Sequence, residues 1–273
     1  MRIVCNKHFG FRAESRVPEP SAERLVTYVI LLIDIGNSRA KWATFKEGKL
    51  GVQCAAAHGS WGEADWRLEI EQSGAARVLA ASVAAPARND LLTAACRATI
   101  GHPPEFANST AAAAGVRNGY SNPAQLGVDR WLAIIGAFHL YQAACCVVDA
   151  GTALTIDGVD ASGQHLGGFI VPGPRLMVES LLTGTSDLAG RWAWESKPDP
   201  ASFPTNTRDA IEQGCLEALA SLVASASRRL ETRAGQTPRL VVTGGGAQVL
   251  APWLSQPTEF IPDLVLQGLA RLA

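Results

Sequence analysis

The sequence lacks the two glycine-rich signatures that most often identify a nucleotide-binding protein. Neither G-x-x-x-x-G-K-[ST] nor G-x-G-x-x-G occurs in its 273 residues. The phosphate loop of P-loop proteins and the dinucleotide loop of Rossmann proteins therefore lose their main support. A nucleotide, if one binds, must be held in another way.

The cysteines show no spacing that is typical of a metal site. There are six cysteines and five histidines, with no C-x-x-C pair and no Cys–His pair at metal-ligand intervals, which argues against structural zinc. Cys145 and Cys146 lie in an apolar run, where cysteine usually acts as a small buried hydrophobe. Adjacent cysteines rarely bridge each other, so we expect reduced thiols and a cytoplasmic location.

Strong charge and long apolar runs are also missing. The formal net charge is −1, which argues against a broad binding surface for nucleic acid or an anionic membrane. No run reaches the roughly 18 uninterrupted apolar residues of a membrane span. Residues 1–24 lack the apolar core of a secretory signal. We therefore expect no nucleic-acid partner and no membrane partner.

The length and composition favour a two-domain globular protein. Hydrophobic residues make up 47% and charged residues 18% of the chain, which is in the globular range. Residues 1–28 scatter Arg, Glu, Pro and Ser without any period and predict an N-terminal extension that is disordered or non-native. The remaining chain divides into a first domain at 29–144 and a second at 145–273.

Two similar turns carry most of the functional information. Asp34-Ile-Gly-Asn-Ser38 and Asp149-Ala-Gly-Thr152 each follow an apolar run. A buried strand followed by Asp-x-Gly and a hydroxyl residue presents backbone N–H groups and a hydroxyl to phosphate oxygens, with a carboxylate near a metal. Either turn alone could be a tight hairpin whose Asp and Gly serve only the bend. Together they favour a duplicated nucleotide-binding fold.

Three later segments add to this pattern. Amphipathic helices are predicted at 130–144 and 209–233, the second ended by Gly235. The strand at 240–243 leads into Gly244-Gly-Gly246, and a last helix is predicted at 263–272. The glycine run could be a flexible corner, or a backbone approached closely by adenosine.

Asp129 and Arg130 stand together at the start of the first of these helices. An aspartate there is typical of helix capping. An arginine is less expected, because a cation opposes the helix dipole at that end, and it indicates an anionic partner.

The paired turns resemble those of the actin, hexokinase and Hsp70 superfamily, an α/β, ribonuclease H-like fold duplicated into two domains, with ATP in the interdomain cleft. Over the chain from about Val29 to the C-terminus, the ordered motifs resemble those of type III pantothenate kinases, the Bvg accessory factor family. The motifs are Asp34–Ser38, Gly127–Arg130, Asp149–Ala153, His165–Gly173, Asn206–Thr207 and Gly244–Gly246.

The resemblance implies ATP-dependent phosphorylation of pantothenate to 4′-phosphopantothenate, the first step of coenzyme A synthesis, by a homodimer with its active site at the interface. It implies Asp129 as catalytic base, Asp149 as ligand of a monovalent cation (K⁺ or NH₄⁺) and Asp34 near Mg²⁺. The implied ATP-binding residues are Asp34, Ile35, Gly36, Asn37, Ser38, Arg39, Ala40, Lys41, Thr152, Gly244 and Gly245. The implied pantothenate-binding residues are Tyr120, Gly127, Val128, Asp129, Arg130 and Thr207.

The chemistry of these residues agrees with such roles. Phosphoryl transfer asks mainly for positioning and charge neutralisation, so Asp129 can orient the substrate hydroxyl with an ordinary pKa of roughly 4. Arg130 offers a planar fork suited to the carboxylate of pantothenate, although an arginine paired across a dimer would look the same in sequence.

Two other functions stay open. Another small-molecule kinase or phosphohydrolase of the same superfamily would keep the Asp34 and Asp149 turns but need not keep Gly127–Arg130. A non-catalytic nucleotide-binding regulator is the other alternative. The absence of a helix-turn-helix signature disfavours DNA binding, and Asp129 beside complete phosphate turns favours catalysis.

Overall fold

The computed structural model describes residues 4–5, 28–57, 59, 61–183 and 200–273. The chain forms two compact units, one of Met1–Asn108 with Val265–Ala273 and one of Ser109–Leu264. This division differs from the boundary expected after residue 144, because the helix at Val128–Tyr141 packs on the strands that follow it. The expected extension at 1–28 lies outside the described residues, apart from residues 4–5 and 28.

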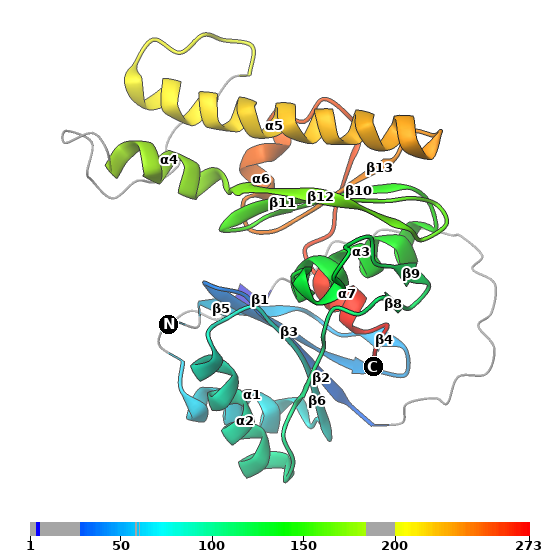
Figure 1. Ribbon diagram of the computed structural model, residues 1–273. Coiled ribbons are helices and arrows are strands. Elements are labelled where there is room, and N and C mark those ends of the chain that lie inside the picture. The colour runs from blue at the N-terminus through cyan, green and yellow to red at the C-terminus, as the bar shows by residue number, and fades with distance from the viewer. Residues whose placement is uncertain (1–3, 6–27, 58, 60, 184–199) are drawn as a thin grey trace. The chain divides into compact units, whose positions relative to one another are not determined.

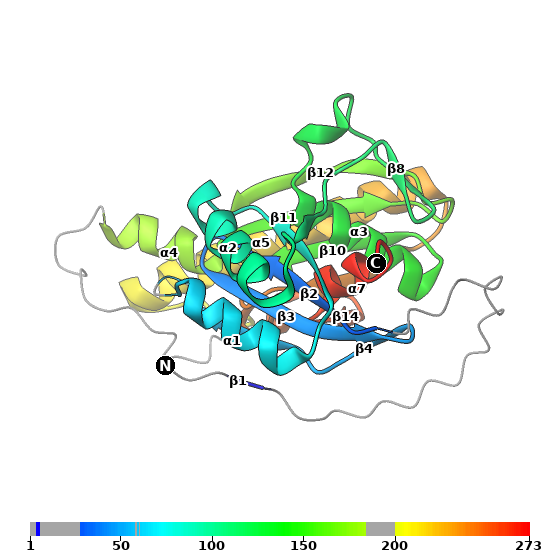
Figure 2. The ribbon, with the colours of Figure 1, turned by 90° about the horizontal axis from the view of Figure 1, so that it is seen from below.

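The first unit contains a seven-stranded sheet in the order β1-β5-β3-β2-β6-β7, with β4 paired to β3. Helices α1 and α2 lie side by side on one face of this sheet (Figure 2). The elements are β1 (Val4–Cys5), β2 (Ile30–Ile35), β3 (Arg39–Lys46), β4 (Lys49–Leu50), β5 (Cys54–Ala57), α1 (Glu63–Ser73), β6 (Arg77–Ser82), α2 (Pro86–Ile100) and β7 (Glu105–Phe106). The short helix α7 (Leu264–Leu269) begins at the boundary between the units.

The centre of the first unit is β2, which is buried along its whole length. Such continuous burial is typical of a strand covered on both faces. Three tryptophans cluster in the same core, where Trp66 meets Trp42 and Trp61 edge to face and the rings of Trp42 and Trp61 are tilted.

The second unit contains a five-stranded sheet in the order β12-β11-β10-β13-β14. Helix α3 lies on one face of this sheet and the long helix α5 on the other (Figure 1). The elements are β8 (Ala112–Ala113), β9 (Val116–Arg117), η2 (Pro123–Gln125), α3 (Val128–Tyr141), β10 (Cys145–Ala150), β11 (Ala153–Val159), β12 (His165–Pro172), α4 (Pro174–Thr183), α5 (Thr207–Ala234), β13 (Arg239–Thr243), α6 (Ala247–Leu250), η3 (Ala251–Trp253) and β14 (Thr258–Phe260).

The two sheets repeat one topology. In the first unit β2 pairs antiparallel with β3 and parallel with β6, which in turn pairs parallel with β7. In the second unit β10 pairs antiparallel with β11 and parallel with β13, which pairs parallel with β14. Strands β5 and β12 occupy the same place beside β3 and β11. The duplication inferred from the paired turns is therefore present in the backbone.

The ends of the helices follow local chemistry. Asn206 caps α5 by accepting a hydrogen bond from the backbone N–H of Asp209, and Gly235 ends the helix in the left-handed conformation at φ 69°, as glycine commonly does. Helix α3 ends at Tyr141, three residues before the predicted end, because Gln142 adopts a left-handed φ of 47°. The last helix is also shorter than predicted.

Four buried cysteines form no disulfide: Cys96, Cys145, Cys146 and Cys215. In the described part of the chain, no helix has the length and apolar character needed to cross a membrane.

Candidate active site

The Asp149 turn and the glycine run meet at one edge of the second sheet. Because β10 and β13 are parallel neighbours with Asp149 opposite Thr243, their carboxyl ends reach the same place. Gly246 N–H donates to the carbonyl of Ala150 at 2.8 Å. Gly244, at φ 92°, leaves no space for a Cβ beside Asp149 Oδ1. The structure thus brings the predicted cation ligand together with the predicted adenosine-binding glycines.

Thr152 belongs to the same cluster. Its carbonyl accepts a hydrogen bond from Gly173 N–H at 2.9 Å, and a Cβ on Gly173 would collide with the backbone of Gly151 and Thr152. Glycine 173, which ends the His165–Gly173 motif, is therefore needed for the close approach of β12 to this turn. Thr152 itself is exposed at the tip.

The first turn lies in the other unit. Asp34 is 9% exposed near the end of β2, and Gly36 N–H closes the turn on the carbonyl of Arg39 at 3.0 Å. Within the predicted segment 34–41, Ile35 and Ala40 face each other in the core, so only their backbone can serve a ligand. The side chains exposed at this turn are those of Asn37, Ser38 and Arg39.

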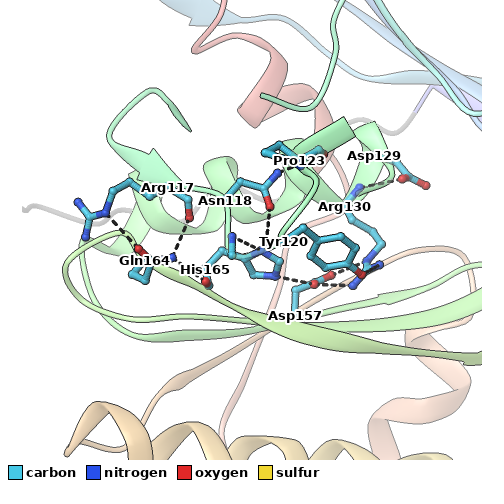
Figure 3. A network of polar contacts seen from close by, with 10 residues as sticks. Arg117, Asn118, Tyr120, Pro123, Asp129, Arg130, Asp157, Gln164 and His165 are labelled. Carbon is cyan, nitrogen blue, oxygen red and sulfur yellow. Dashed lines mark hydrogen bonds and ion pairs between the residues drawn. The ribbon is translucent and has the colours of Figure 1, made fainter. Parts of the chain in front are cut away.

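Arg130 has a buried partner that the sequence did not reveal. Its Nε donates to Asp157 Oδ2 at 2.8 Å and its Nη2 to Asp157 Oδ1 at 2.7 Å (Figure 3). Both side chains are buried, Asp157 at 2% and Arg130 at 6% exposure. Burial lowers the pKa of Arg130, but the hydrogen bonds and charge of Asp157 outweigh it and raise this pKa above its ordinary value.

His165 completes the surroundings of Asp157. Its Nδ1 accepts the backbone N–H of Gly119 at 3.3 Å, so its other nitrogen, Nε2, carries the proton and donates to Asp157 Oδ1 at 3.0 Å. The carboxylate thus receives three side-chain donors, two from Arg130 and one from His165. A buried carboxylate needs such pairing to remain charged.

Tyr120 links the two sides of this network. Its hydroxyl accepts a hydrogen bond from Arg130 Nη1 at 2.9 Å, and its ring stacks on His165 with 5.9 Å between centroids. Asn118 holds the loop that carries it, accepting the N–H of Tyr120 at 3.0 Å and donating to the carbonyl of Pro123 at 3.4 Å. The loop before α3 is therefore fixed from both ends (Figure 3).

Asp129 lies beside this network but does not cap the helix. The N-cap of α3 is Gly127, and Val128 is the first helical residue. Asp129 Oδ1 accepts the backbone N–H of Arg130 at 2.8 Å, and its carboxylate points away from Asp157 (Figure 3). Burial, the largest influence, raises the pKa of Asp129 above its ordinary value, so the ordinary pKa expected from sequence is corrected upward.

Glycine 168 gives the Arg130–Asp157 pair its space. It lies opposite Asp157 in the β11–β12 ladder. A Cβ on Gly168 would collide with Asp157 Oδ1 and with the carbonyl of Ile156, and would lie 2.8 Å from Arg130 Nη2. Gly168 of the His165–Gly173 motif therefore serves the same network as Tyr120 and Arg130.

The network changes the interpretation of Arg130. The anionic partner expected for an arginine at a helix start is Asp157 of the same chain. The fork expected to receive the carboxylate of pantothenate is therefore occupied on its Nε–Nη2 side. Sequence reasoning also missed Asp157 and gave His165 no role of its own.

Thr207 stands apart from the other predicted pantothenate-binding residues. It is the exposed first residue of α5, after the N-cap Asn206. There it lines a groove between α4 and α5 with Met177, Leu181 and Ile211. Helix α5 covers the face of the sheet opposite to α3 (Figure 1), so one chain does not bring Thr207 together with Tyr120, Asp129 and Arg130.

Two solved structures show what the backbone resembles. A component of (R)-2-hydroxyglutaryl-CoA dehydratase (component A) from Acidaminococcus fermentans matches with a TM-score of 0.52 and 17% identity, covering 89% of this chain and 95% of that chain. The ethanolamine utilization protein EutJ from Carboxydothermus hydrogenoformans matches with a TM-score of 0.50 and 14% identity, covering 94% and 92%. The fold is that of the actin/hexokinase/Hsp70-like ATPases.

Sequence comparison gives the family. Residues 30–229 match the pattern of type III pantothenate kinase. A type III pantothenate kinase from Chromobacterium violaceum is 41% identical over 246 residues, which cover 89% of this chain and 98% of that protein. One from Laribacter hongkongensis is 39% identical over 249 residues, covering 90% and 98%. With its duplicated fold and its ordered motifs, this chain belongs to the type III pantothenate kinase family.

Proposed function

We propose that this chain transfers a phosphoryl group from ATP to the 4′-hydroxyl of pantothenate, the first step of coenzyme A synthesis. Membership of the family supports the reaction. The observation that carries it is a partly buried carboxylate, Asp129, placed directly beside the Tyr120–Arg130–Asp157 network at the start of α3.

Asp129 is the proposed catalytic base. One of its oxygens is held by the N–H of Arg130, which fixes the side chain while its second oxygen remains to accept the proton of the substrate hydroxyl. A base works best when its pKa lies near the working pH. The raised pKa of Asp129 moves it in that direction. The proton transfers late, since phosphoryl transfer passes through a loose transition state.

The two turns are the proposed phosphate sites. Backbone N–H groups at 34–41, with the hydroxyl of Ser38, would contact phosphate oxygens from the first unit. Thr152 would do so from the second, where Gly244 and Gly245 would lie against adenosine. At Gly245 a Cβ would meet nothing within 4 Å, so the backbone there is open to a ligand. Oriented N–H donors of this kind suit a phosphate group, whose negative charge is spread over several oxygens.

The oxygen donors at the Asp34 and Asp149 turns indicate which cations each turn would hold. The described residues hold no group of three or more metal-binding side chains. Mg²⁺ fits such a surface, because it is usually held by one or two carboxylates with phosphate oxygens and water, and Asp34 would supply the carboxylate. Asp149, beside the carbonyl-rich turn at 150–152, would hold K⁺ or NH₄⁺. The cation would neutralise phosphate charge when bound.

A homodimer is the proposed assembly. Thr207 begins α5, whereas Tyr120 bonds to Arg130 of α3. These two helices lie on opposite faces of one sheet (Figure 1), so a threonine that contacts pantothenate would come from a second copy. The unbridged thiols of Cys96, Cys145, Cys146 and Cys215 agree with a cytoplasmic enzyme. No nucleic-acid or membrane partner is proposed.

The test is ADP release from ATP and Mg²⁺, measured with and without pantothenate in K⁺, NH₄⁺ or Na⁺. We expect release that requires pantothenate and is faster in K⁺ or NH₄⁺ than in Na⁺. Release that ignores pantothenate, from a protein that still binds ATP, would contradict the proposed substrate and favour another hydroxyl acceptor. Binding of ATP without turnover would favour the non-catalytic regulator.

A further inference from the structure

Asp157 is a charged residue in the interior that the proposed chemistry does not yet use. It is 2% exposed and lies in the middle strand of three, opposite Val147 on β10 and Gly168 on β12. Its backbone is therefore held from both sides. Its carboxylate faces α3, with two hydrogen bonds from Arg130 and one from His165.

These hydrogen bonds determine which N–H groups of Arg130 remain to contact a ligand. A guanidinium has five N–H donors in one plane. Asp157 takes one on Nε and one on Nη2, and the hydroxyl of Tyr120 takes one on Nη1. Two-point attachment to a rigid strand prevents the guanidinium from rotating. Two N–H groups, one on Nη1 and one on Nη2, keep a fixed direction.

We propose that Asp157 is a positioning residue for pantothenate: it holds Arg130 so that the two remaining N–H groups of the guanidinium, next to the Tyr120 hydroxyl, form a preorganised contact for the substrate. The inference rests on the proposed function. It implies that Arg130 meets an acceptor of pantothenate through the end of its guanidinium, and that the fork itself serves Asp157.

The arrangement explains why the site includes a buried ion pair. Replacing such a pair by apolar residues is often neutral or stabilising, so stability alone does not account for it. Preorganisation does, because a donor that is already aligned loses less freedom when the substrate binds. His165 strengthens the hold, because its Nε2 donates to Asp157 Oδ1 while its Nδ1 accepts the N–H of Gly119 in the loop that carries Tyr120.

The test compares steady-state kinetics of the full chain carrying Asp157→Asn, Asp157→Glu, Arg130→Gln and the double change Asp157→Asn with Arg130→Gln. Asp160→Asn is the matched control, since Asp160 is a half-buried aspartate in the turn between β11 and β12 whose side chain bonds to Ser162 and Gln164. The readouts are KM for pantothenate, KM for ATP, kcat and the melting temperature.

We expect Asp157→Asn to raise KM for pantothenate by roughly 10- to 100-fold, the loss of a contact through a charged hydrogen bond, with KM for ATP and the Asp160→Asn control unchanged. The double variant should equal Arg130→Gln, because Asp157 acts through Arg130. Effects that multiply in the double variant would overturn the inference. So would Asp157→Asn with unchanged KM values and only less active protein.

Asp157→Glu keeps the test decisive if Asp157→Asn does not fold. It retains the buried charge pair but moves the carboxylate by one methylene, so it folds while displacing the guanidinium. Positioning predicts a raised KM for pantothenate, and simple charge neutralisation predicts none. A wild-type enzyme that does not phosphorylate pantothenate would reject the proposed function and this inference with it. An active wild type with an unaffected Asp157→Glu rejects the inference alone.

Discussion

Gly168→Ala is a sharp stability test of how the site is packed. The added methyl group would collide with the carbonyl of Ile156 and with Asp157 Oδ1, and would lie 2.8 Å from Arg130 Nη2. The strand cannot move away easily, since β12 is paired with β11 along its length. The methyl group must therefore displace the Arg130–Asp157 pair or distort the ladder.

The magnitude follows from three terms. Overpacking costs about 1–3 kcal/mol, and a weakened charged hydrogen bond costs about 1.5–3 kcal/mol. The lower entropy of the unfolded alanine chain returns about 0.4–1 kcal/mol. We expect a net loss of about 3 kcal/mol, or roughly 6–12 °C in melting temperature for a unit of this size.

Gly214→Ala is the matched control. Gly214 lies in the exposed interior of α5, and a Cβ there would meet nothing within 4 Å. Alanine in place of glycine in a helix should stabilise by about 1 kcal/mol. Thermal and urea unfolding, monitored by far-ultraviolet circular dichroism, would measure the stability of both variants. A Gly168→Ala protein as stable as the wild type would refute the packing argument.

Three further predictions concern single groups. Burial raises the pKa of Asp129, so Asp129→Asn should be more stable than the wild type at neutral pH, with an advantage that shrinks as the pH falls through the folded-state pKa toward the unfolded value of about 4; urea unfolding at several pH values checks this, and a gap that widens in acid would contradict it. Burial raises the pKa of Cys96, Cys145 and Cys146 to about 12, so these thiols should resist a disulfide reagent at pH 8 until the chain unfolds, and fast labelling of the native protein would count against their burial. Asn206→Ala should lower stability by about 1 kcal/mol through loss of the α5 cap, whereas Asn206→Ser should retain most of it, as denaturant midpoints would show.

The strands and the long helix could be predicted because their signals are local. The apolar run at 29–33 and the Asp-Gly turn after it define β2, and Gly235 marks the end of α5. The same reasoning failed at the end of α3, where Gln142 takes a left-handed conformation that favours glycine. It also put the domain boundary after residue 144, between α3 and the sheet on which α3 packs, because contacts between distant segments leave no local sequence pattern.

Motifs could place the Asp34 and Asp149 turns near the ends of β2 and β10 and Asp129 at the start of α3, but the network around Arg130 could not be predicted. Arg130 and Asp157 are 27 residues apart, and only the register of β11 decides that Asp157 faces α3 while its neighbour Ile156 faces α5. Nothing in the sequence indicated that Arg130 and His165 both donate to the carboxylate of Asp157. The correction to Arg130 comes from that long-range pairing.

The identity of the product tests the proposed phosphorylation of pantothenate more sharply than any rate. Pantothenate, ATP and Mg²⁺ in K⁺ buffer are incubated with the wild type and with a folded Asp129→Asn variant, and the products are examined by phosphorus NMR and mass spectrometry. We expect 4′-phosphopantothenate and ADP in equal amounts from the wild type, and a rate lower by about 10²–10⁴ for the variant. Phosphate released to water, phosphorylation elsewhere on pantothenate, or an unimpaired Asp129→Asn enzyme would contradict it.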